Sequence, residues 1–128
     1  GFRAARAAAP LQEAVIPGLE FGQDYYDDLL AKYTHKKDLF LKGLDDLHIS
    51  HNDPEGAYYV LLDIREYGYE SDLQFCKNLA REVGVGAVPG SSFFREPVNH
   101  LIRLHFAKND DTLNEALNRL EKIQKLKK

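Results

Sequence analysis

The sequence predicts an α+β fold, a two-layer sandwich in which a small, mostly antiparallel sheet is covered by helices. Helical and strand-like segments alternate irregularly along the chain, without the regular βαβ repeat of a parallel sheet. The strand-like segments are short, apolar and bounded by turn residues. The composition, 44% hydrophobic and 29% charged, is that of a folded globular domain rather than of a disordered chain.

Helical spacing of apolar residues predicts the longer helices. The longest helix opens at Gln23 or Asp24 and ends near Gly43, and its apolar positions are Leu29, Tyr33, Phe40 and Leu44. The next is predicted to begin after Ser71 as N-cap, to run to Val83, and to end at Gly84 as C-cap. Its expected inward stripe is Leu73, Cys76, Leu79, Ala80 and Val83.

Two further helices complete the helical layer. Asn109 or Asp110 caps the last one, whose expected inward residues are Leu113, Ala116, Leu117, Leu120 and Ile123. A short helix over Leu11 to Leu19 is also expected, although Pro17 and Gly18 weaken it. The predicted strands are residues 48–51, 57–63, 85–88 and 99–106, and the run Asn52-Asp53-Pro54-Glu55-Gly56 is a dense turn signal between the first two.

The whole chain, residues 1–128, is predicted to be one domain, because 128 residues suffice for one hydrophobic core and no low-complexity linker divides them. Residues 1–9, rich in Ala and Arg, are a poorly defined N-terminal segment to which we assign no function. The chain contains no methionine, with which a complete primary product begins. We therefore expect a piece of a longer protein.

Composition argues against several classes of function. A net charge of −3 disfavours nucleic acid as a partner. No apolar run approaches the roughly 20 residues that span a bilayer, so we expect no membrane segment. No metal site is expected, because His48 and His51 lack a third ligand and His100 and His105 fall on opposite faces of their strand. The single cysteine, Cys76, lies on an inward helical stripe and is expected in the core.

Arg103 is the most informative single residue. In the predicted strand 99–106, Ile102, Leu104 and Phe106 share the face that suits packing under helices, and Arg103 lies on the other face. An arginine in mid-strand between apolar residues needs an anionic partner, because an unpaired buried charge is costly. The residues alone leave three alternatives open: a structural ion pair, a solvated face or the carboxylate of a ligand. A guanidinium binds a carboxylate through two parallel hydrogen bonds.

The segment Val88-Pro89-Gly90-Ser91-Ser92-Phe93-Phe94 precedes that strand. Its Pro-Gly pair followed by two serines can present N–H groups and hydroxyls to a ligand, so Ser91, Ser92 and Phe93 form a possible active-site loop. An ordinary turn is the alternative reading.

Four stretches in order resemble the C-terminal part of class I/II aminotransferases, the fold-type I enzymes that depend on pyridoxal 5'-phosphate (PLP). They are Ala9-Pro10-Leu11-Gln12-Glu13-Ala14, the helix from Tyr25-Tyr26 to Lys36-Lys37-Asp38, Pro54-Glu55-Gly56-Ala57-Tyr58-Tyr59, and the run from Val83-Gly84-Val85 to Ile102-Arg103-Leu104. Lysines stand where the family's helix usually has arginines. The segment Phe106 to Leu113 is similar to that of the kynurenine, glutamine and methionine aminotransferase group.

The resemblance implies the small domain of an aminotransferase, in which Arg103 grips the α-carboxylate of the substrate. The intact enzyme would use PLP to move an amino group between an amino acid and a 2-oxo acid, as a cytoplasmic homodimer, with an organelle also possible. The family's Schiff-base lysine lies in an S-x-x-K motif of the large domain, and no lysine here has that context. The resemblance therefore implies no catalytic or cofactor-binding residue in this piece, which we expect to be inactive and free of PLP.

The rival hypothesis is a stand-alone α+β module that binds a small ligand or regulates without catalysis. The exposed surface should separate the two, because a piece of a larger enzyme should show an apolar patch where the large domain and partner subunit dock.

Overall fold

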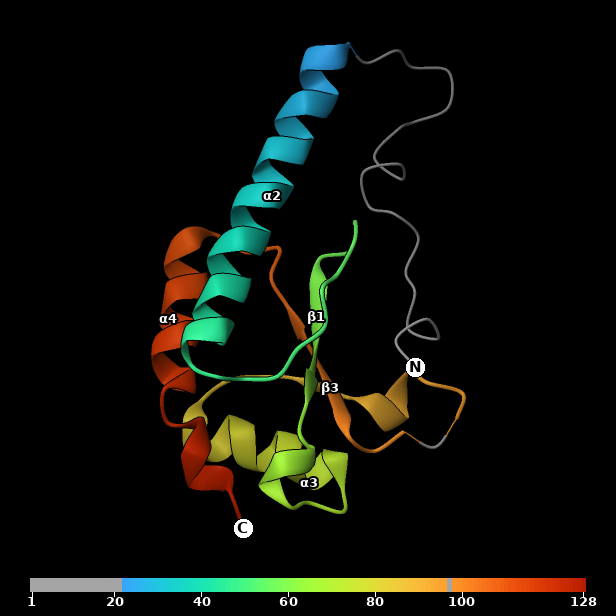
Figure 1. Cartoon of the computed structure of the whole chain (residues 1–128), viewed down its shortest axis with the longest axis vertical. Coiled ribbons are helices and arrows are strands. Elements are labelled where there is room, and N and C mark those ends of the chain that lie inside the picture. The colour runs from blue at the N-terminus through green and yellow to red at the C-terminus, as the bar shows by residue number, and fades with distance from the viewer. Residues whose placement is uncertain (1–21, 97) are drawn as a thin grey trace.

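The computed structural model describes residues 22–96 and 98–128, and the predicted helix over Leu11 to Leu19 lies outside this range. The described chain forms α2 (Gln23–Asp46), β1 (Tyr59–Asp63), α3 (Asp72–Asn78), β2 (Val88–Pro89), β3 (Leu101–His105) and α4 (Asp110–Leu120), joined by short helical turns. The three strands form one antiparallel sheet in the order β1-β3-β2. The predicted α+β class, a small antiparallel sheet with covering helices, is confirmed (Figure 1).

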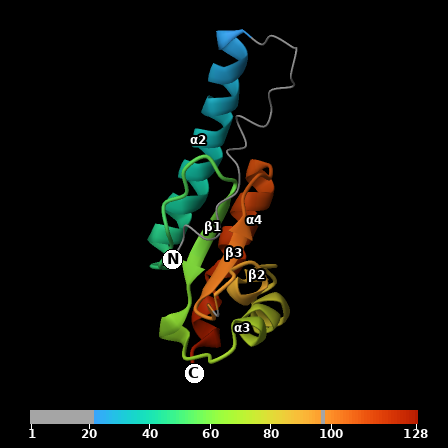
Figure 2. The same ribbon diagram turned by 90° about the vertical axis from the view of Figure 1, so that its right-hand side faces the viewer.

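The helices cover one face of the sheet (Figure 2). Alternate strand residues pack against them, so one core joins α2, α3, α4 and the sheet through buried residues that include Phe40, Leu44, Val60, Leu62, Phe75, Leu79, Ile102, Leu104, Phe106, Leu113 and Leu120. The opposite face carries a second, smaller cluster of Leu61, Phe94, Val98 and Leu101. The alternation predicted for residues 101–106 therefore places Arg103 on the face away from the helices.

The predicted caps form as expected at two helices. The Ser71 side chain accepts a hydrogen bond from the Gln74 N–H at 3.1 Å, and Asn109 accepts one from the Thr112 N–H at 2.8 Å. Gly84 adopts the left-handed conformation, with φ of 85°, that ends helices at glycine. Between Leu79 and Val83 the helix widens into a π-helical turn, because the Gly84 N–H bonds to the Leu79 carbonyl.

The observed strands are shorter than the predicted ones. The first predicted strand, residues 48–51, is reduced to an isolated bridge between His51 and Leu62. The predicted strands 57–63, 85–88 and 99–106 shrink to β1, β2 and β3, and β2 has only two residues. Pairing with β3 decides these lengths, since β2 meets it only at Arg103 and Ile102.

The stripe expected on α3 was partly wrong. Leu73 is 49% exposed and Ala80 is also exposed, whereas Asp72 and Phe75 are buried. The buried set follows 72, 75, 76, 79 and 83, which is also a helical spacing, so periodicity could not choose between the two stripes. Cys76 is buried, as predicted, and burial, with the nearby Asp72 adding, raises the pKa of its thiol to about 12. Such a thiol stays protonated and unreactive near neutral pH.

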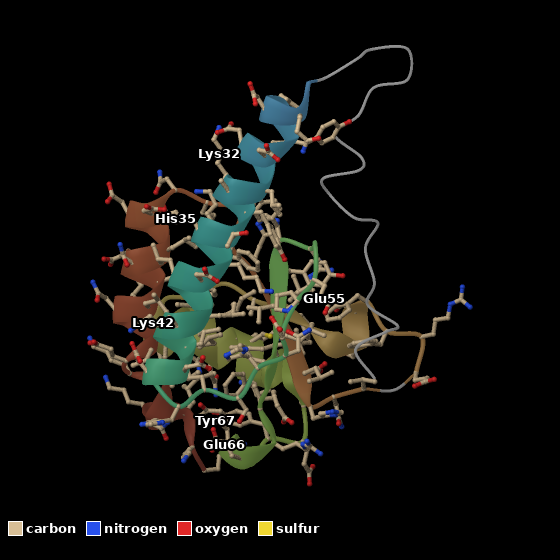
Figure 3. The ribbon with its side chains drawn as sticks, turned by 45° about the horizontal axis from the view of Figure 1, so that its top comes forward. Lys32, His35, Lys42, Glu55, Glu66 and Tyr67 are labelled. Carbon is tan, nitrogen blue, oxygen red and sulfur yellow. The ribbon has the colours of Figure 1, made fainter. Side chains whose placement is uncertain are left out.

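The long helix α2 carries a row of exposed charged residues on its outer side. Lys32, His35 and Lys42 are labelled along this side in Figure 3, and His35 Nε2 lies 2.7 Å from Asp110 Oδ2 at the start of α4. On its inner side, the Tyr33 hydroxyl donates to the carbonyl of Ala57 at 3.0 Å and holds the turn before β1. In the part of the chain described, no helix is long and apolar enough to cross a membrane.

Candidate functional site

Arg103 lies in the middle of the central strand, where both cross-strand neighbours are apolar. Its register partners are Leu61 on β1 and Val88 on β2. Within residues 22–96 and 98–128, the guanidinium makes no hydrogen bond and no ion pair. The structural ion pair that the sequence left open is thus not formed with any described residue. No described residue occupies the five N–H donors through which a guanidinium binds an anion.

Two aromatic rings flank this guanidinium. Its central carbon lies 4.9 Å from the centroid of the Tyr59 ring and 4.8 Å from that of Phe93. Both distances are within the range of attraction between a cation and the face of a ring. Tyr59 stands diagonally across the β1–β3 ladder, since its direct partner is His105. Phe93 reaches the same place from the loop that follows β2.

The loop that contains Ser91, Ser92 and Phe93 is anchored by its own contacts. Ser91 donates through its N–H to Asp72 Oδ2 at 2.7 Å and through its hydroxyl to Asp72 Oδ1 at 3.0 Å. Ser92 is exposed, and Phe93 contacts Arg103. Of the three residues proposed for this loop from the sequence, only Phe93 is brought into contact with Arg103 by the structure.

Asp72 was not identified from the sequence. Its carboxylate is 4% exposed and also accepts the Leu73 N–H at 2.8 Å, so it holds three hydrogen bonds in all. An acidic residue just after an N-cap usually faces solvent and stabilises the helix N-terminus. The sequence pattern at Asp72 is therefore the ordinary one and gives no sign of a buried anchor. Tyr59 was missed for a different reason. Its strand was predicted, but only the register of β1 against β3 shows that it lies beside Arg103.

His105 is the other titratable residue on this face of β3. His105 is an exposed residue, but partial desolvation of its imidazole lowers the pKa below the ordinary value, and the positive charges of Lys108 and Arg103 lower it further. The neutral ring is therefore favoured next to Arg103, which limits the positive charge concentrated at this end of the sheet.

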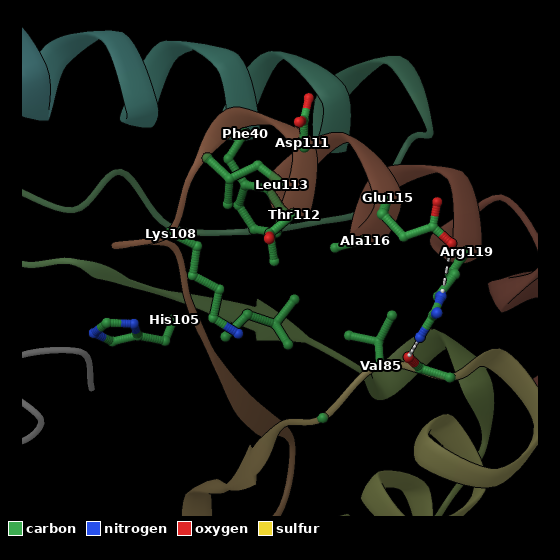
Figure 4. A pocket seen from close by; sticks show the side chains of 13 residues that line it. Phe40, Val85, His105, Lys108, Asp111, Thr112, Leu113, Glu115, Ala116 and Arg119 are labelled. Atoms are coloured by element: carbon green, nitrogen blue, oxygen red, sulfur yellow. Dashed lines mark hydrogen bonds and ion pairs between the residues drawn. The ribbon is translucent and has the colours of Figure 1, made fainter.

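A cavity of about 380 Å³ lies elsewhere, beside α4 (Figure 4). Apolar side chains, among them Phe40, Leu104 and Leu113, line it together with Lys108 and Thr112. Arg119 closes one end by donating to the Gly84 carbonyl at 2.8 Å and to Glu115 at 3.1 Å. Neither Arg103 nor Ser91, Ser92 or Phe93 lines this cavity, so it is distinct from the candidate site.

Two further features of the described range bear on function, its possible metal ligands and its exposed apolar residues. No group of three or more His, Cys, Asp or Glu side chains there could hold a metal ion. Among the described residues, the exposed large apolar ones are Tyr25, Leu30, Leu73 and Val88, which are distributed over α2, α3 and β2. Exposed apolar surface therefore does not separate a piece of an enzyme from a stand-alone module, and the decision rests on comparison with known proteins.

The profile of the family described as "Aminotransferase class I and II" matches residues 3–120. A probable N-succinyldiaminopimelate aminotransferase, DapC, of Mycobacterium tuberculosis is 33% identical over 94% of this chain and 34% of its own length. The methionine aminotransferase of Escherichia coli is 35% identical over 89% of this chain and 30% of its own. The crystal structure of YbdL from E. coli, a protein described as having a methionine aminotransferase function, superposes with a TM-score of 0.71 at 35% identity, over 77% of this chain and 26% of that one. The chain thus spans about a third of the length of the relatives it matches.

Proposed function

Because the chain belongs to the family of class I and II aminotransferases, we propose that residues 1–128 are the single C-terminal small domain of a longer, PLP-dependent aminotransferase. That enzyme would transfer an amino group between an amino acid and a 2-oxo acid. Support comes from the match to only about a third of each relative. The methionine aminotransferase among those relatives supports the kynurenine, glutamine and methionine group suggested by residues 106–113.

Arg103 is proposed to bind the α-carboxylate of the amino-acid substrate. The observation that carries this role is a half-buried arginine on the central strand, without a hydrogen bond or an ion pair to any described residue. A carboxylate fits such a guanidinium through two parallel hydrogen bonds, which a lysine ammonium cannot reproduce. The contact would fix the position of the substrate and leave its amino group free to react.

Lys37, a partly buried lysine of the described range, is a poor candidate for the Schiff base with PLP. A lysine that forms a Schiff base must give up its proton near neutral pH, usually because burial or another cation lowers its pKa. Lys37, whose side chain is 22% exposed, is held by Asp53 at 2.9 Å, and this hydrogen bond raises the pKa of its ammonium. We therefore propose that the large domain of the same protein holds the cofactor and supplies the catalytic lysine, and that this chain alone is inactive.

The remaining features of the whole enzyme are proposed on the family resemblance, except that the absence of nucleic-acid and membrane partners is also supported by the net charge and the lack of a long apolar run. They are a homodimeric assembly, a cytoplasmic location, substrates that are an amino acid and a 2-oxo acid, and the absence of nucleic-acid or membrane partners.

The test is substitution of Arg103 in the complete enzyme. Arg103→Lys keeps the charge and loses the two-pronged contact, so kcat/KM for the amino acid should fall by about 30-fold to several thousand-fold, the loss expected when one partner of a buried charge pair is removed. PLP content should stay unchanged. Arg81→Lys, at an exposed arginine beside Glu82, is the matched control. An unchanged kcat/KM for Arg103→Lys would remove this residue from the substrate site.

A further inference from the structure

The two rings beside Arg103 come from parts of the chain that are far apart in sequence. Tyr59 is the first residue of β1, and Phe93 follows the turn Gly90–Ser92. Resting on the proposed function, we propose that Tyr59 and Phe93 are positioning residues that hold the Arg103 guanidinium so that its N–H groups face the substrate carboxylate.

Each ring is held in place independently of Arg103. Both pack against the second apolar cluster, in which Leu61 is 1% and Phe94 7% exposed. The Phe93 ring also contacts the Phe94 ring in a tilted arrangement, with ring centroids 4.7 Å apart. Its N–H bonds to the Gly90 carbonyl at 3.1 Å, which fixes the backbone at the base of the ring. The positions of the two rings therefore do not depend on their contact with Arg103.

The loop that carries Phe93 is fixed at a second point by Asp72. The two hydrogen bonds between Ser91 and this buried carboxylate tie the turn to the start of α3. The loop is thus held by Asp72 through its hydrogen bonds to Ser91, and it contacts Arg103 through the ring of Phe93.

The chemistry of this arrangement explains why rings, rather than a carboxylate, stand beside the arginine. A neighbouring Asp or Glu would occupy the N–H groups and compete with the substrate. An aromatic face attracts the cation without accepting those N–H bonds strongly. Arginine otherwise loses much side-chain freedom when it binds, and holding it beforehand reduces that cost.

The experiment replaces each ring in the complete, PLP-loaded enzyme. Tyr59→Leu and Phe93→Leu should each raise KM for the amino acid about 2- to 30-fold, the range that one cation–ring contact supports, with kcat within about twofold of the original. Tyr59→Phe and Phe93→Tyr keep the rings and should restore KM. Tyr58→Leu is the matched control, because Tyr58 precedes Tyr59 and packs instead against Tyr33 and Phe106. It should lower stability without raising KM.

A second substrate separates positioning from general damage. A primary amine that lacks the α-carboxylate makes no contact with Arg103, so the leucine variants should react with it as fast as the unmodified enzyme does. Equal losses with amine and amino acid, unchanged KM in both leucine variants, or an equal rise in KM for Tyr58→Leu would each overturn the proposal. If Tyr59→Leu does not fold, Phe93→Leu decides, because Phe93 lies in a loop and is only half-buried.

Failure of the proposed function gives a different result. An unmodified enzyme without transaminase activity, or with activity insensitive to Arg103→Lys, would refute the carboxylate site itself. An Arg103-dependent enzyme whose leucine variants keep their KM would refute only the role of the rings.

Discussion

At the scale of single residues, Asp72 and Arg103 differ in their burial and in their hydrogen-bond partners, and this difference indicates different roles. The carboxylate of Asp72 is buried and accepts three hydrogen bonds from its own chain, which is what a buried charge requires to be stable. Arg103 is half-buried and pairs with no described carboxylate, although rings flank it. We interpret the first as an anchor of the fold and the second as a binding group.

His105 gives a prediction about pH at the same scale. Its pKa is lowered in the folded chain by partial desolvation and by the charges of Lys108 and Arg103, whereas in the unfolded chain it titrates near the ordinary value of about 6.5. Between these two values the unfolded state binds more protons, so the free energy of unfolding should rise with pH through this window and level off above about 6.5.

An NMR titration of the imidazole measures this directly. The His105 ring should titrate below about 6.5, and Lys108→Gln should move its pKa upward by removing one of the two positive charges. The variant His105→Gln should lose the corresponding rise of stability with pH. A ring that titrates above the ordinary value would contradict the desolvation and charges described here.

At the scale of elements, the short loop between β2 and β3 depends on close backbone packing. A Cβ added at Gly90 would lie 2.7 Å from the carbonyl oxygen of Leu101 on β3, a backbone atom that cannot rotate away. The turn therefore approaches the strand only because residue 90 has no side chain. Phe93 directly follows this turn, so we expect its position beside Arg103 to depend on this close packing.

Gly90→Ala should consequently lower the free energy of unfolding by about 1–3 kcal/mol, the usual cost of overpacking. In the complete enzyme it should also raise KM, because Phe93 is displaced with the loop. Gly86→Ala is the control, since nothing lies within 4 Å of a Cβ at that exposed position, and its effect should stay within about 0.5 kcal/mol. Denaturant unfolding of both variants decides; equal stability would show that the loop can move away from β3 freely.

At the scale of the whole molecule, one sheet separates two environments. The helices α2, α3 and α4 lie on one face of the sheet (Figure 2). That face holds the main core, and the other face holds the small cluster that supports Tyr59, Phe93 and Arg103. Because side chains alternate along β3, Ile102 and Leu104 belong to the main core, whereas Arg103 between them belongs to the candidate site. Lys37 of α2 is paired with Asp53, in the turn before β1.

This arrangement predicts how the 128-residue chain behaves with PLP. Because Asp53 holds the ammonium of Lys37 in its charged form, no stoichiometric adduct should form there. Treatment with PLP and borohydride, followed by mass spectrometry, should show at most scattered, substoichiometric labelling of exposed lysines. Full labelling of one lysine, or turnover of an amino acid by the chain alone, would contradict the proposed division of labour with the large domain.

The local sequence determined the helices, their caps and the alternation of β3. Ser71, Asn109 and Gly84 act through bonds or backbone angles within a few residues, and the face that Arg103 occupies follows from strand geometry alone. Only the tertiary structure decided which stripe of α3 is buried, how short the strands are, and that Tyr59, Phe93 and Arg103 meet. These features depend on strand register and on contacts between segments far apart in the chain, and local periodicity carries no information about either.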